Sequence, residues 1–378
     1  MKEKYLLVFS GYNQRAVIAF LRTLVQCNVD NYLIVASSNE DAIFGTKYYN
    51  KVIYTRKNKE LSVTLFQEII KKVEKENNNA EFVIAPSTEG LNRFLLDNLE
   101  DLKKINCIVP LVKKELYCTI SDKESFSKVC NNFELDIPPS IRIEECFSTP
   151  FVAKPKKYYS EKGKETFSPV LVTNEIEFDK FYKTYNKNDF FYQEYIWGES
   201  YYLLYYITQT GRIYKFSQKN LAQQPDGKSI IAAVPSIIHE ENISLRYENM
   251  LLDLHYYGFI MIELRKRKDK FYMIEANPRF WGPSQLFCDA GMNLFEIFLL
   301  EYGFINNEFI HTKNICEDTR YLWYDGIQQI KDAGKDIVVY DETLEHTWFD
   351  DSGWKKWDIY HREDTIKISM MNTSKFKR

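Results

Sequence analysis

The stretch MIEANPRFWG, residues 273–282, places an acid, an amide and an arginine directly after two apolar residues. The polar residues Glu275, Asn277 and Arg279 alternate along the stretch, and alternate side chains of a strand share one face. Polar and charged groups that are buried in this way need partners, because an unpaired buried charge is costly. The stretch therefore predicts a polar site at the end of a strand.

The residues just before this stretch form its expected strand partner. GFIMIEL (258–264) and KFYMIEANP (270–278) are predicted to be two strands of a hairpin that turns near Lys268–Asp269 within the charged run RKRKDK. This turn position places Glu263 and Glu275 close to opposite each other. Like charges across a strand pair repel, so the two carboxylates need a cation between them.

Glu263, Glu275 and Asn277 together form a set of oxygen ligands of the kind that Mg²⁺ prefers, usually with water and nucleotide phosphates. Arg279 shares their face and could hold a phosphate oxygen. The alternative is a salt bridge between Arg279 and one of the acids at a sheet edge, and spacing alone leaves both open. If repulsion dominates, neutralising Glu275 should leave the metal-free protein equally stable or more stable.

Two other short runs contain candidate site residues. Lys154 ends the apolar run FVAKP (151–155), where a lysine needs a partner unless its amine reaches the surface. In QEYIWGES (193–200), Glu194 and Glu199 flank an apolar strand end, which could be a hinge that offers backbone groups to a base and a carboxylate to a ribose. The alternative for this run is a charged turn.

The first third of the chain alternates strand-like and helix-like patterns. Apolar runs typical of buried strands occur at 4–11, 31–37, 51–55, 81–86 and 107–110, with helical spacing between them. This alternation is typical of a doubly wound parallel sheet. The turn at Gly11 does not have the GxGxxG pattern, which favours a tight strand-to-helix turn over a dinucleotide site.

The pattern changes near residue 121. Ser121 followed by Glu124 has the form of a capping box and predicts a helix that ends before Pro138. The run 201–220 is predicted to be a hairpin turning at Thr210–Gly211. Antiparallel hairpins therefore replace the parallel pattern in the second part of the chain.

The 378 residues suit two or three domains. A formal net charge of −3 gives no electrostatic reason to expect a nucleic acid or an anionic membrane as partner. The seven cysteines contain no CxxC pair, and with no signal-like N-terminus they favour a cytoplasmic protein. No apolar run approaches the roughly 18 residues of a membrane span.

In this order the three runs resemble the ATP-grasp superfamily, over about residues 1–303. IEANPRFWG is similar to the E-x-N-P-R signature of the carbamoyl phosphate synthetase large subunit and of carboxylate–amine ligases. The resemblance implies an α/β (α+β) fold in which two lobes with antiparallel sheets grip a nucleotide. The implied units are a Rossmann-like domain at 1–118, a first lobe at 119–198, a second lobe with the metal site at 199–310, and a C-terminal extension at 311–378.

The resemblance also assigns roles to individual residues. Phosphates would be held by Lys123 and Lys154, adenine by Glu194, Tyr195 and Ile196, ribose by Glu199, the metal by Glu263, Glu275 and Asn277, and the transferred phosphate by Arg279 with Lys154. Lys219 is a further candidate cation in the cleft. The loop at 156–169 departs from the family pattern, because Gly163 is its single glycine where several usually occur.

The implied activity is that of an ATP-dependent carboxylate–amine ligase, or one using a related nucleophile, that works through an acylphosphate. It would use ATP with Mg²⁺, or Mn²⁺ in its place, act on a small-molecule carboxylate and an amine, and could form a homodimer. The alternatives are a carbamoyl phosphate synthetase-like ATP-binding subunit and a nucleotide-binding module without turnover. The tail at 311–378 would be a cap or subunit contact, or else a segment packed on the second lobe.

Overall fold

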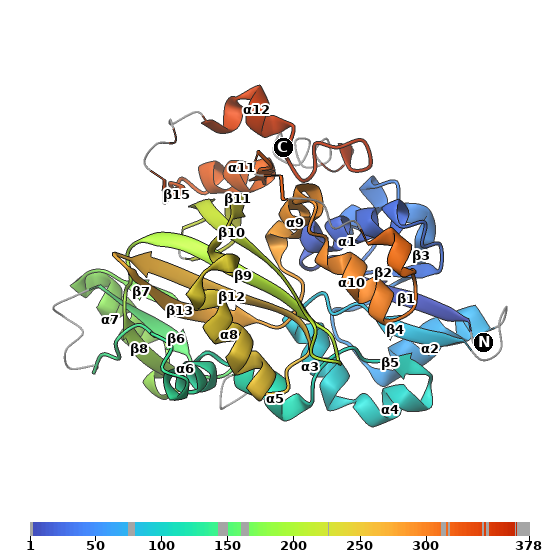
Figure 1. The fold of residues 1–378 in the computed structure, drawn as a ribbon, viewed down its shortest axis with the longest axis horizontal. Coiled ribbons are helices and arrows are strands. Elements are labelled where there is room, and N and C mark those ends of the chain that lie inside the picture. The colour runs from blue at the N-terminus through green and yellow to red at the C-terminus, as the bar shows by residue number, and fades with distance from the viewer. Residues whose placement is uncertain are drawn as a thin grey trace.

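The computed structural model describes residues 3–74, 80–142, 150–159, 166–225, 227–310, 315, 316, 318–341, 344, 348–366 and 368. Within these residues the chain forms one parallel sheet and two antiparallel sheets (Figure 1). The parallel sheet lies at one end of the molecule, and the antiparallel sheets lie at the other. The α/β class predicted from the sequence is confirmed.

The parallel sheet has the strand order β3-β2-β1-β4-β5. Its strands are β1 (Lys4–Phe9), β2 (Tyr32–Ala36), β3 (Val52–Thr55), β4 (Glu81–Ile84) and β5 (Cys107–Ile108). The connecting helices are α1 (Gln14–Gln26), α2 (Val63–Glu74), α3 (Glu89–Asp97) and α4 (Leu99–Lys104). Apolar residues of the inner strands are buried on both faces, as in other helix-covered parallel sheets. The predicted alternation of strands and helices is confirmed.

The larger antiparallel sheet has the order β13-β12-β9-β10-β11-β14, and β15 pairs with β10. Its strands are β9 (Glu199–Ile207), β10 (Ile213–Gln223), β11 (Ile230–Ser236), β12 (Gly258–Arg267), β13 (Lys270–Asn277), β14 (Tyr321–Leu322) and β15 (Val338–Val339). Both predicted hairpins, β9–β10 and β12–β13, are confirmed with their turns in the expected places.

The smaller antiparallel sheet has the order β7-β6-β8, with β6 (Phe151–Pro155), β7 (Val170–Val172) and β8 (Phe190–Glu194). The remaining helices are α5 (Lys114–Ser121), α6 (Lys123–Asn132), α7 (Glu175–Thr184), α8 (Asn242–Asp253), α9 (Gln285–Ala290), α10 (Leu294–Glu301), α11 (Tyr324–Asp332) and α12 (Ser352–Lys355). Short 3₁₀ turns lie at Ala42–Gly45, Tyr49–Lys51, Lys187–Asp189, Ile238–Glu240, Gly282–Ser284, Asn307–Phe309 and Trp348–Asp350.

The capping box predicted at Ser121 and Glu124 is wrong. Ser121 is the last residue of α5, and Asp122 is the residue before α6, without a side-chain cap. Both side chains instead serve a tertiary contact, because Arg93 donates to Ser121 Oγ at 2.7 Å and to Asp122 Oδ1 at 2.6 Å. The helix itself ends before Pro138 as predicted.

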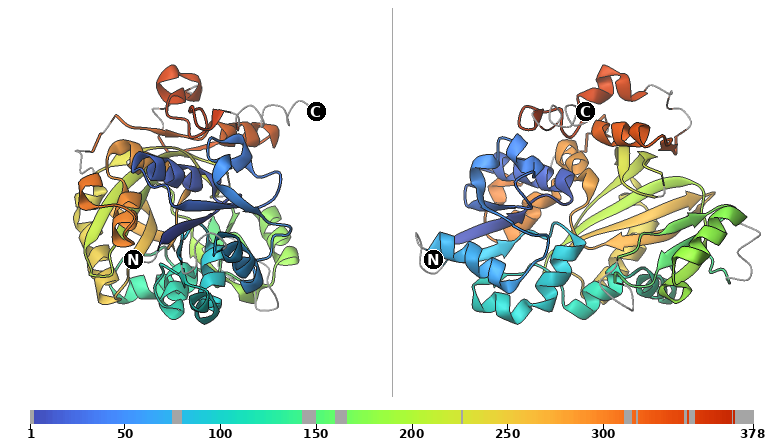
Figure 2. Two further views of the ribbon diagram at one scale, coloured as in Figure 1. Left: turned by 90° about the vertical axis from the view of Figure 1, so that its right-hand side faces the viewer. Right: turned by 180° about the vertical axis from the view of Figure 1, so that it is seen from behind.

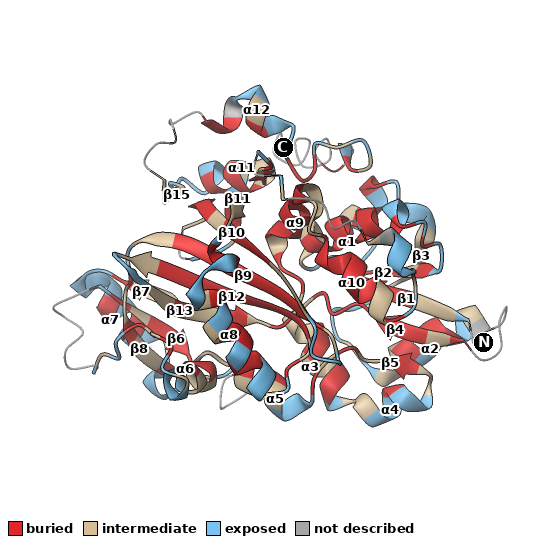
Figure 3. Cartoon of the chain, in the orientation of Figure 1, coloured by how far each residue is buried: buried red, intermediate tan, exposed pale blue. Residues whose placement is uncertain are grey.

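One apolar core joins the parallel sheet to the larger antiparallel sheet. Phe20 of α1 packs on Phe280 at a ring-centre distance of 5.0 Å, and Phe280 packs on Phe259 of β12 at 5.1 Å. Figure 3 shows this buried zone running from α1 and α10 into the long strands β9 and β12. The signature stretch therefore lies where the two sheets meet. The division into four domains stays a prediction, and its first boundary falls within α5.

The C-terminal segment runs back over both parts of the molecule (Figure 2). β14 pairs with β11, and β15 pairs with β10. Further on, Asp364 accepts from Arg22 of α1 through both carboxylate oxygens at 2.9 Å. This segment thus packs on the predicted second lobe and on α1.

The six cysteines in the described residues are free thiols, and Cys146 lies outside them. None of the described helices has the length and hydropathy that crossing a membrane requires.

Candidate functional site

The β12–β13 hairpin carries the site that the signature predicted. Its register pairs Glu263 directly with Glu275, and the pairing shifts by one residue just after them. Met261 pairs with Asn277 in the same ladder. The expected opposition of the two carboxylates is therefore confirmed. The turn alone would pair Glu263 with Ile274, and the one-residue shift brings Glu275 opposite Glu263.

Glu275 has a cation beside it already in the ligand-free protein. Lys123, at the start of α6, forms an ion pair with Glu275 Oε2, and Nδ2 of Asn277 donates to Glu275 Oε1 at 2.8 Å. Burial alone would raise the pKa of Glu275, but Lys123, Asn277 and the nearby Arg279 together hold the pKa at about 2. Glu275 is therefore an ionised acid.

Glu263 is more deeply buried, with 6% of its surface exposed. Burial raises its pKa, and repulsion from Glu275 adds to that shift, whereas Arg265 opposes it. Arg265 Nη2 lies 3.2 Å from Glu263 Oε1 and also donates to Tyr340 OH at 2.7 Å. Arg265 was not predicted as a site residue, although strand alternation places it on the same face as Glu263.

Lys154 reaches from the smaller antiparallel sheet to the larger one. Its Nζ donates to the carbonyl oxygen of Ile274 in β13 at 2.8 Å, and only 4% of the residue is exposed. This burial excludes the alternative of a lysine that extends to the surface. Burial, with Lys123 nearby, lowers the pKa of Lys154 to about 7, although Glu275 and Glu263 act in the opposite direction.

Arg279 makes no ion pair with any carboxylate of the described residues, so the salt-bridge alternative is wrong there. It donates to Asn277 Oδ1 at 3.0 Å and to the carbonyl oxygen of Phe280 at 2.8 Å. The hydrogen-bond acceptors of Arg279 are thus neutral, and its positive charge is available to bind an anionic ligand.

The expected hinge holds a second group of candidates. Glu194 pairs with Arg267 at 2.5 Å, and Glu199 pairs with Lys219 at 2.7 Å. Tyr195 is half-buried, and burial raises its pKa while Arg265 lowers it and Glu263 raises it. Next to Tyr195, Ile196 is 3% exposed. Glu194 and Tyr195 therefore lie near the end of β12 that carries Arg265 and Arg267.

The oxygen ligands of the β12–β13 hairpin fit a magnesium ion. The described residues contain no group of three or more His, Cys, Asp or Glu side chains that could hold one. Glu263, Glu275 and Asn277 supply two carboxylates and one amide. That set fits Mg²⁺, which takes one or two carboxylates and completes its shell with water and substrate phosphates.

Residues 160–165 of the loop after Lys154 lie outside the described residues, and with them Ser160 and Gly163. The preceding part of the loop is anchored to the core. The backbone N–H of Tyr158 donates to Asp122 Oδ1 at 3.1 Å, and the Arg93 guanidinium lies 4.7 Å from the centre of the Tyr158 ring.

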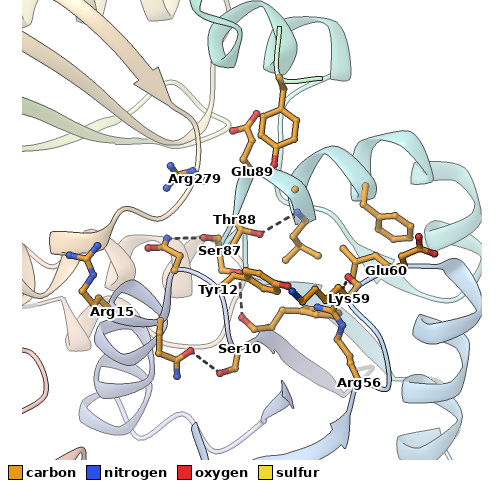
Figure 4. Close-up of a pocket in the computed structure, with 18 of the residues that line it drawn as sticks. Ser10, Tyr12, Arg15, Arg56, Lys59, Glu60, Ser87, Thr88, Glu89 and Arg279 are labelled. Atoms are coloured by element: carbon orange, nitrogen blue, oxygen red, sulfur yellow. Dashed lines mark hydrogen bonds between the residues drawn. The ribbon is translucent and has the colours of Figure 1, made fainter. Parts of the chain in front are cut away.

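A cavity of about 1190 Å³ opens beside the signature stretch, at the carboxyl edge of the parallel sheet; we call it the sheet-edge cavity (Figure 4). Its polar and charged lining includes Ser10, Tyr12, Asn13, Gln14, Arg15, Arg56, Lys59, Glu60, Ser87, Thr88, Glu89, Tyr158, Arg279 and Trp323. Of these residues, only Arg279 was predicted from the sequence as a site residue. The others could have been predicted from their place in the chain, because ligands bind beyond the carboxyl ends of parallel strands.

No protein-family model matches the chain, and no curated protein sequence matches it. Solved structures do match. One is the biotin carboxylase domain of a Hydrogenobacter thermophilus 2-oxoglutarate carboxylase, in complex with MgADP, ADP and bicarbonate. It has a TM-score of 0.58 and 15% identity, over 82% of this chain and 72% of that one.

Two further structures show the same similarity. N5-carboxyaminoimidazole synthetase from Staphylococcus aureus, complexed with ADP, has a TM-score of 0.56 at 13% identity, over 85% of this chain and 81% of that one. Biotin carboxylase from Campylobacter jejuni has a TM-score of 0.57 at 12% identity, over 84% and 73%. All three are ATP-grasp enzymes. Their shared architecture and the sheet arrangement above show that this chain has the ATP-grasp fold.

Proposed function

We propose that the protein is an ATP-dependent ligase that activates a carboxylate as an acylphosphate and then joins it to an amine or a related nucleophile. The observation that carries the proposal is the convergence of charge between the two antiparallel sheets. Lys154 from β6 and Lys123 from α6 both reach β13, where Glu275 faces Glu263. Cations and oxygen ligands gathered at one point suit the triphosphate of a Mg²⁺-bound nucleotide.

The similar structures support this proposal because they were solved with bound nucleotides. The Hydrogenobacter thermophilus domain was solved with MgADP and the Staphylococcus aureus enzyme with ADP. By analogy, ATP with Mg²⁺, or with Mn²⁺ in its place, is the proposed cosubstrate of this chain. Expectations of a cytoplasmic protein, a homodimer and a small-molecule acid and amine remain predictions.

In the proposed reaction the residues of the chain divide the work. Lys123 and Lys154 bind phosphate oxygens, and Arg279, whose charge is otherwise unpaired by carboxylates in the described residues, stabilises the transferred phosphoryl group. Glu263, Glu275 and Asn277 would hold Mg²⁺, which neutralises charge on the phosphates.

The base and sugar of the nucleotide are assigned to the hinge. Glu194, Tyr195 and Ile196 border the base, and Glu199 binds the ribose hydroxyls. Lys219 fixes the Glu199 carboxylate through their 2.7 Å ion pair. Lys219, which the sequence suggested as a cation in the cleft, would therefore position Glu199, the residue that binds the ribose.

The test is phosphate release from ATP and Mg²⁺ in the presence of pooled carboxylic acids and amines. We expect release to require one acid pool, and ligated product to require an amine pool as well. Arg279→Gln should lose release while keeping ADP binding. ADP binding without release in any pool would favour a nucleotide-binding module, and carbamoyl phosphate made from bicarbonate would favour the carbamoyl phosphate synthetase-like alternative. Failure to bind ADP would overturn the proposal.

A further inference from the structure

The sheet-edge cavity adjoins the proposed phosphoryl-transfer site and is built largely from the other half of the molecule. Arg279 of the signature stretch and Tyr158 of the loop after Lys154 line one side. Ser10 after β1, Arg56 after β3 and Ser87 after β4 line the side formed by the parallel sheet. A molecule bound there would therefore touch both the activating site and the parallel sheet.

The cations of this cavity are not neutralised by ion pairs with the described residues. Arg15 donates to the Ile230 carbonyl at 3.0 Å and to Tyr321 OH at 3.1 Å, and Arg56 donates to the Lys59 carbonyl. Arg279, as shown above, also contacts only neutral acceptors. The cavity thus contains three guanidinium groups whose charge no carboxylate of the described residues neutralises.

Most of the cavity's acids are already paired. Glu89 accepts from Arg93 at 2.7 Å, and Asp97 accepts from Lys114 at 2.7 Å. Glu60, the other acid on the lining, is exposed to solvent. The lining is therefore positively charged overall, and the acids do not cancel its arginines.

Buried donors without partners point the same way. Arg56 is 6% exposed and its Nε has no hydrogen-bond partner, and Gln14 Nε2 and Trp323 Nε1 are likewise unpartnered. The backbone N–H of Gly11 donates to Gln14 Oε1 at 2.9 Å, which fixes the amide with its nitrogen unsatisfied. A buried donor left without a partner costs about 1–3 kcal/mol. All three donors belong to residues that line the cavity, although the donor atoms themselves are covered.

Two local features position the anion-binding groups. The Arg15 guanidinium stacks 3.9 Å from the centre of the Trp323 ring, and Gly282 leaves the space it occupies, because a Cβ there would lie 2.9 Å from Nη2. Arg15 also belongs to the first turn of α1, which contains no acidic side chain. A helix N-terminus carries partial positive charge, which adds to the attraction for an anion.

We propose that the sheet-edge cavity binds the carboxylate acceptor of the ligase, and that this acceptor carries a second anionic group, either another carboxylate or a phosphate. The reacting carboxylate lies toward Arg279 and Arg15, and Arg56 and Lys59, on the other side of the pocket, hold the second group. Figure 4 shows Arg279 and Arg56 on different sides of the pocket, with Tyr12 and Thr88 between them. This inference names the substrate class of the proposed function and rests on it.

The test compares ligands that carry two anionic groups, called the dianions, with matched ligands that carry one. Succinate, glutarate and 3-phosphoglycerate are titrated calorimetrically against succinamate, glutaramate and glycerate, with the protein free and loaded with ADP and Mg²⁺. We expect at least one dianion to bind roughly tenfold more tightly than its monoanionic match, a difference of about 1.4 kcal/mol. Arg56→Gln should remove most of that preference.

Lys59→Gln and Lys57→Gln provide the second variant and the control. Both lysines are exposed, so both variants should fold, but only Lys59 lines the cavity. Lys59→Gln should weaken dianion binding severalfold, and Lys57→Gln should leave it unchanged. Equal binding of matched ligands, or no binding by any dianion, would overturn the inference. Dianion binding by a protein that does not bind ADP would leave this inference standing and remove the proposed function.

Discussion

Lys123 at the start of α6 is the ion-pair partner of Glu275 in β13, 152 positions further along the chain. Arg279, which is closer in sequence, contacts Asn277 instead. Glu275 therefore sits between a cation that it already holds and Glu263, the acid that faces it. Its ionised form is stabilised before any nucleotide arrives, and this changes what a neutralising substitution should do.

Glu275→Gln should destabilise the ligand-free protein. The substitution leaves Lys123 without its acid, and a hydrogen bond to a charged group contributes about 1.5–3 kcal/mol. Repulsion from Glu263 alone would predict the opposite sign, but the low pKa of Glu275 shows that attraction exceeds repulsion at this position. Urea unfolding of both proteins at pH 7 measures the difference.

A double-mutant cycle isolates the pair. Lys123→Met combined with Glu275→Gln should cost less than the two single changes together, because the partners interact. The stabilisation that Mg²⁺ adds to ADP binding should also shrink in Glu275→Gln. A variant that is as stable as wild type and keeps its full Mg²⁺-dependent shift in melting temperature would contradict the metal-site proposal.

Lys154→Met should weaken ADP binding by about tenfold or more, equivalent to at least 1.4 kcal/mol. It should lower fold stability by no more than about 1–3 kcal/mol, the cost of leaving the Ile274 carbonyl without its donor. Methionine fills similar space and removes a charge whose burial is unfavourable, as the lowered pKa of Lys154 indicates. Calorimetric titration with ADP and Mg²⁺, together with urea unfolding, separates the two effects. Unchanged ADP affinity in a folded variant would assign Lys154 a structural role only.

Tyr340→Phe should lower the free energy of unfolding by about 1 kcal/mol, the usual value of a lost hydrogen bond. Its hydroxyl links Gln223 and Arg265, while its ring lies 4.2 Å from the Arg265 guanidinium carbon. Tyr340→Ala also removes that stacking, and should cost more and weaken ADP binding near the hinge. Tyr49→Phe, at a residue that is 59% exposed, is the matched control. Equal effects of Tyr340→Phe and Tyr49→Phe would exclude a role for the hydroxyl.

His239 should make stability fall as the pH drops below 6.5. Burial lowers its pKa in the folded protein, with Lys215 acting in the same direction and Glu240 and Glu248 opposing. Below pH 6.5 the unfolded chain therefore binds a proton that the folded protein resists, and stability decreases by up to about 1.4 kcal/mol per pH unit.

The check is urea unfolding of wild type and His239→Gln between pH 5 and pH 8. Because Ser217 Oγ lies 2.7 Å from His239 Nδ1, the variant will be less stable at neutral pH, and only the change of the difference with pH is informative. The wild type should lose its advantage as the pH falls. A constant difference would show that His239 titrates equally in both states.

Local pattern was enough to predict the β12–β13 hairpin. The charged run at 265–270 fixed the turn and brought Glu263 and Glu275 close to each other, and the one-residue register shift beside Glu263 made them direct partners. The capping box at Ser121 failed because local pattern could not show that Ser121 ends α5 and that Arg93 donates to its hydroxyl. Local sequence patterns predict a structure correctly when residues close in sequence determine it, and they fail when a distant residue such as Arg93 does.

By itself the sequence determined the strand and helix pattern, the hairpin that carries Glu263 and Glu275, and the resemblance to an ATP-grasp fold. Only the tertiary structure decided that Lys123 pairs with Glu275, that Lys154 reaches Ile274, and that unpaired arginines meet Arg279 in one cavity. The physical reason is distance along the chain. Periodicity reports which face of an element is buried, whereas the partners of a buried charge come from segments that only chain packing brings together.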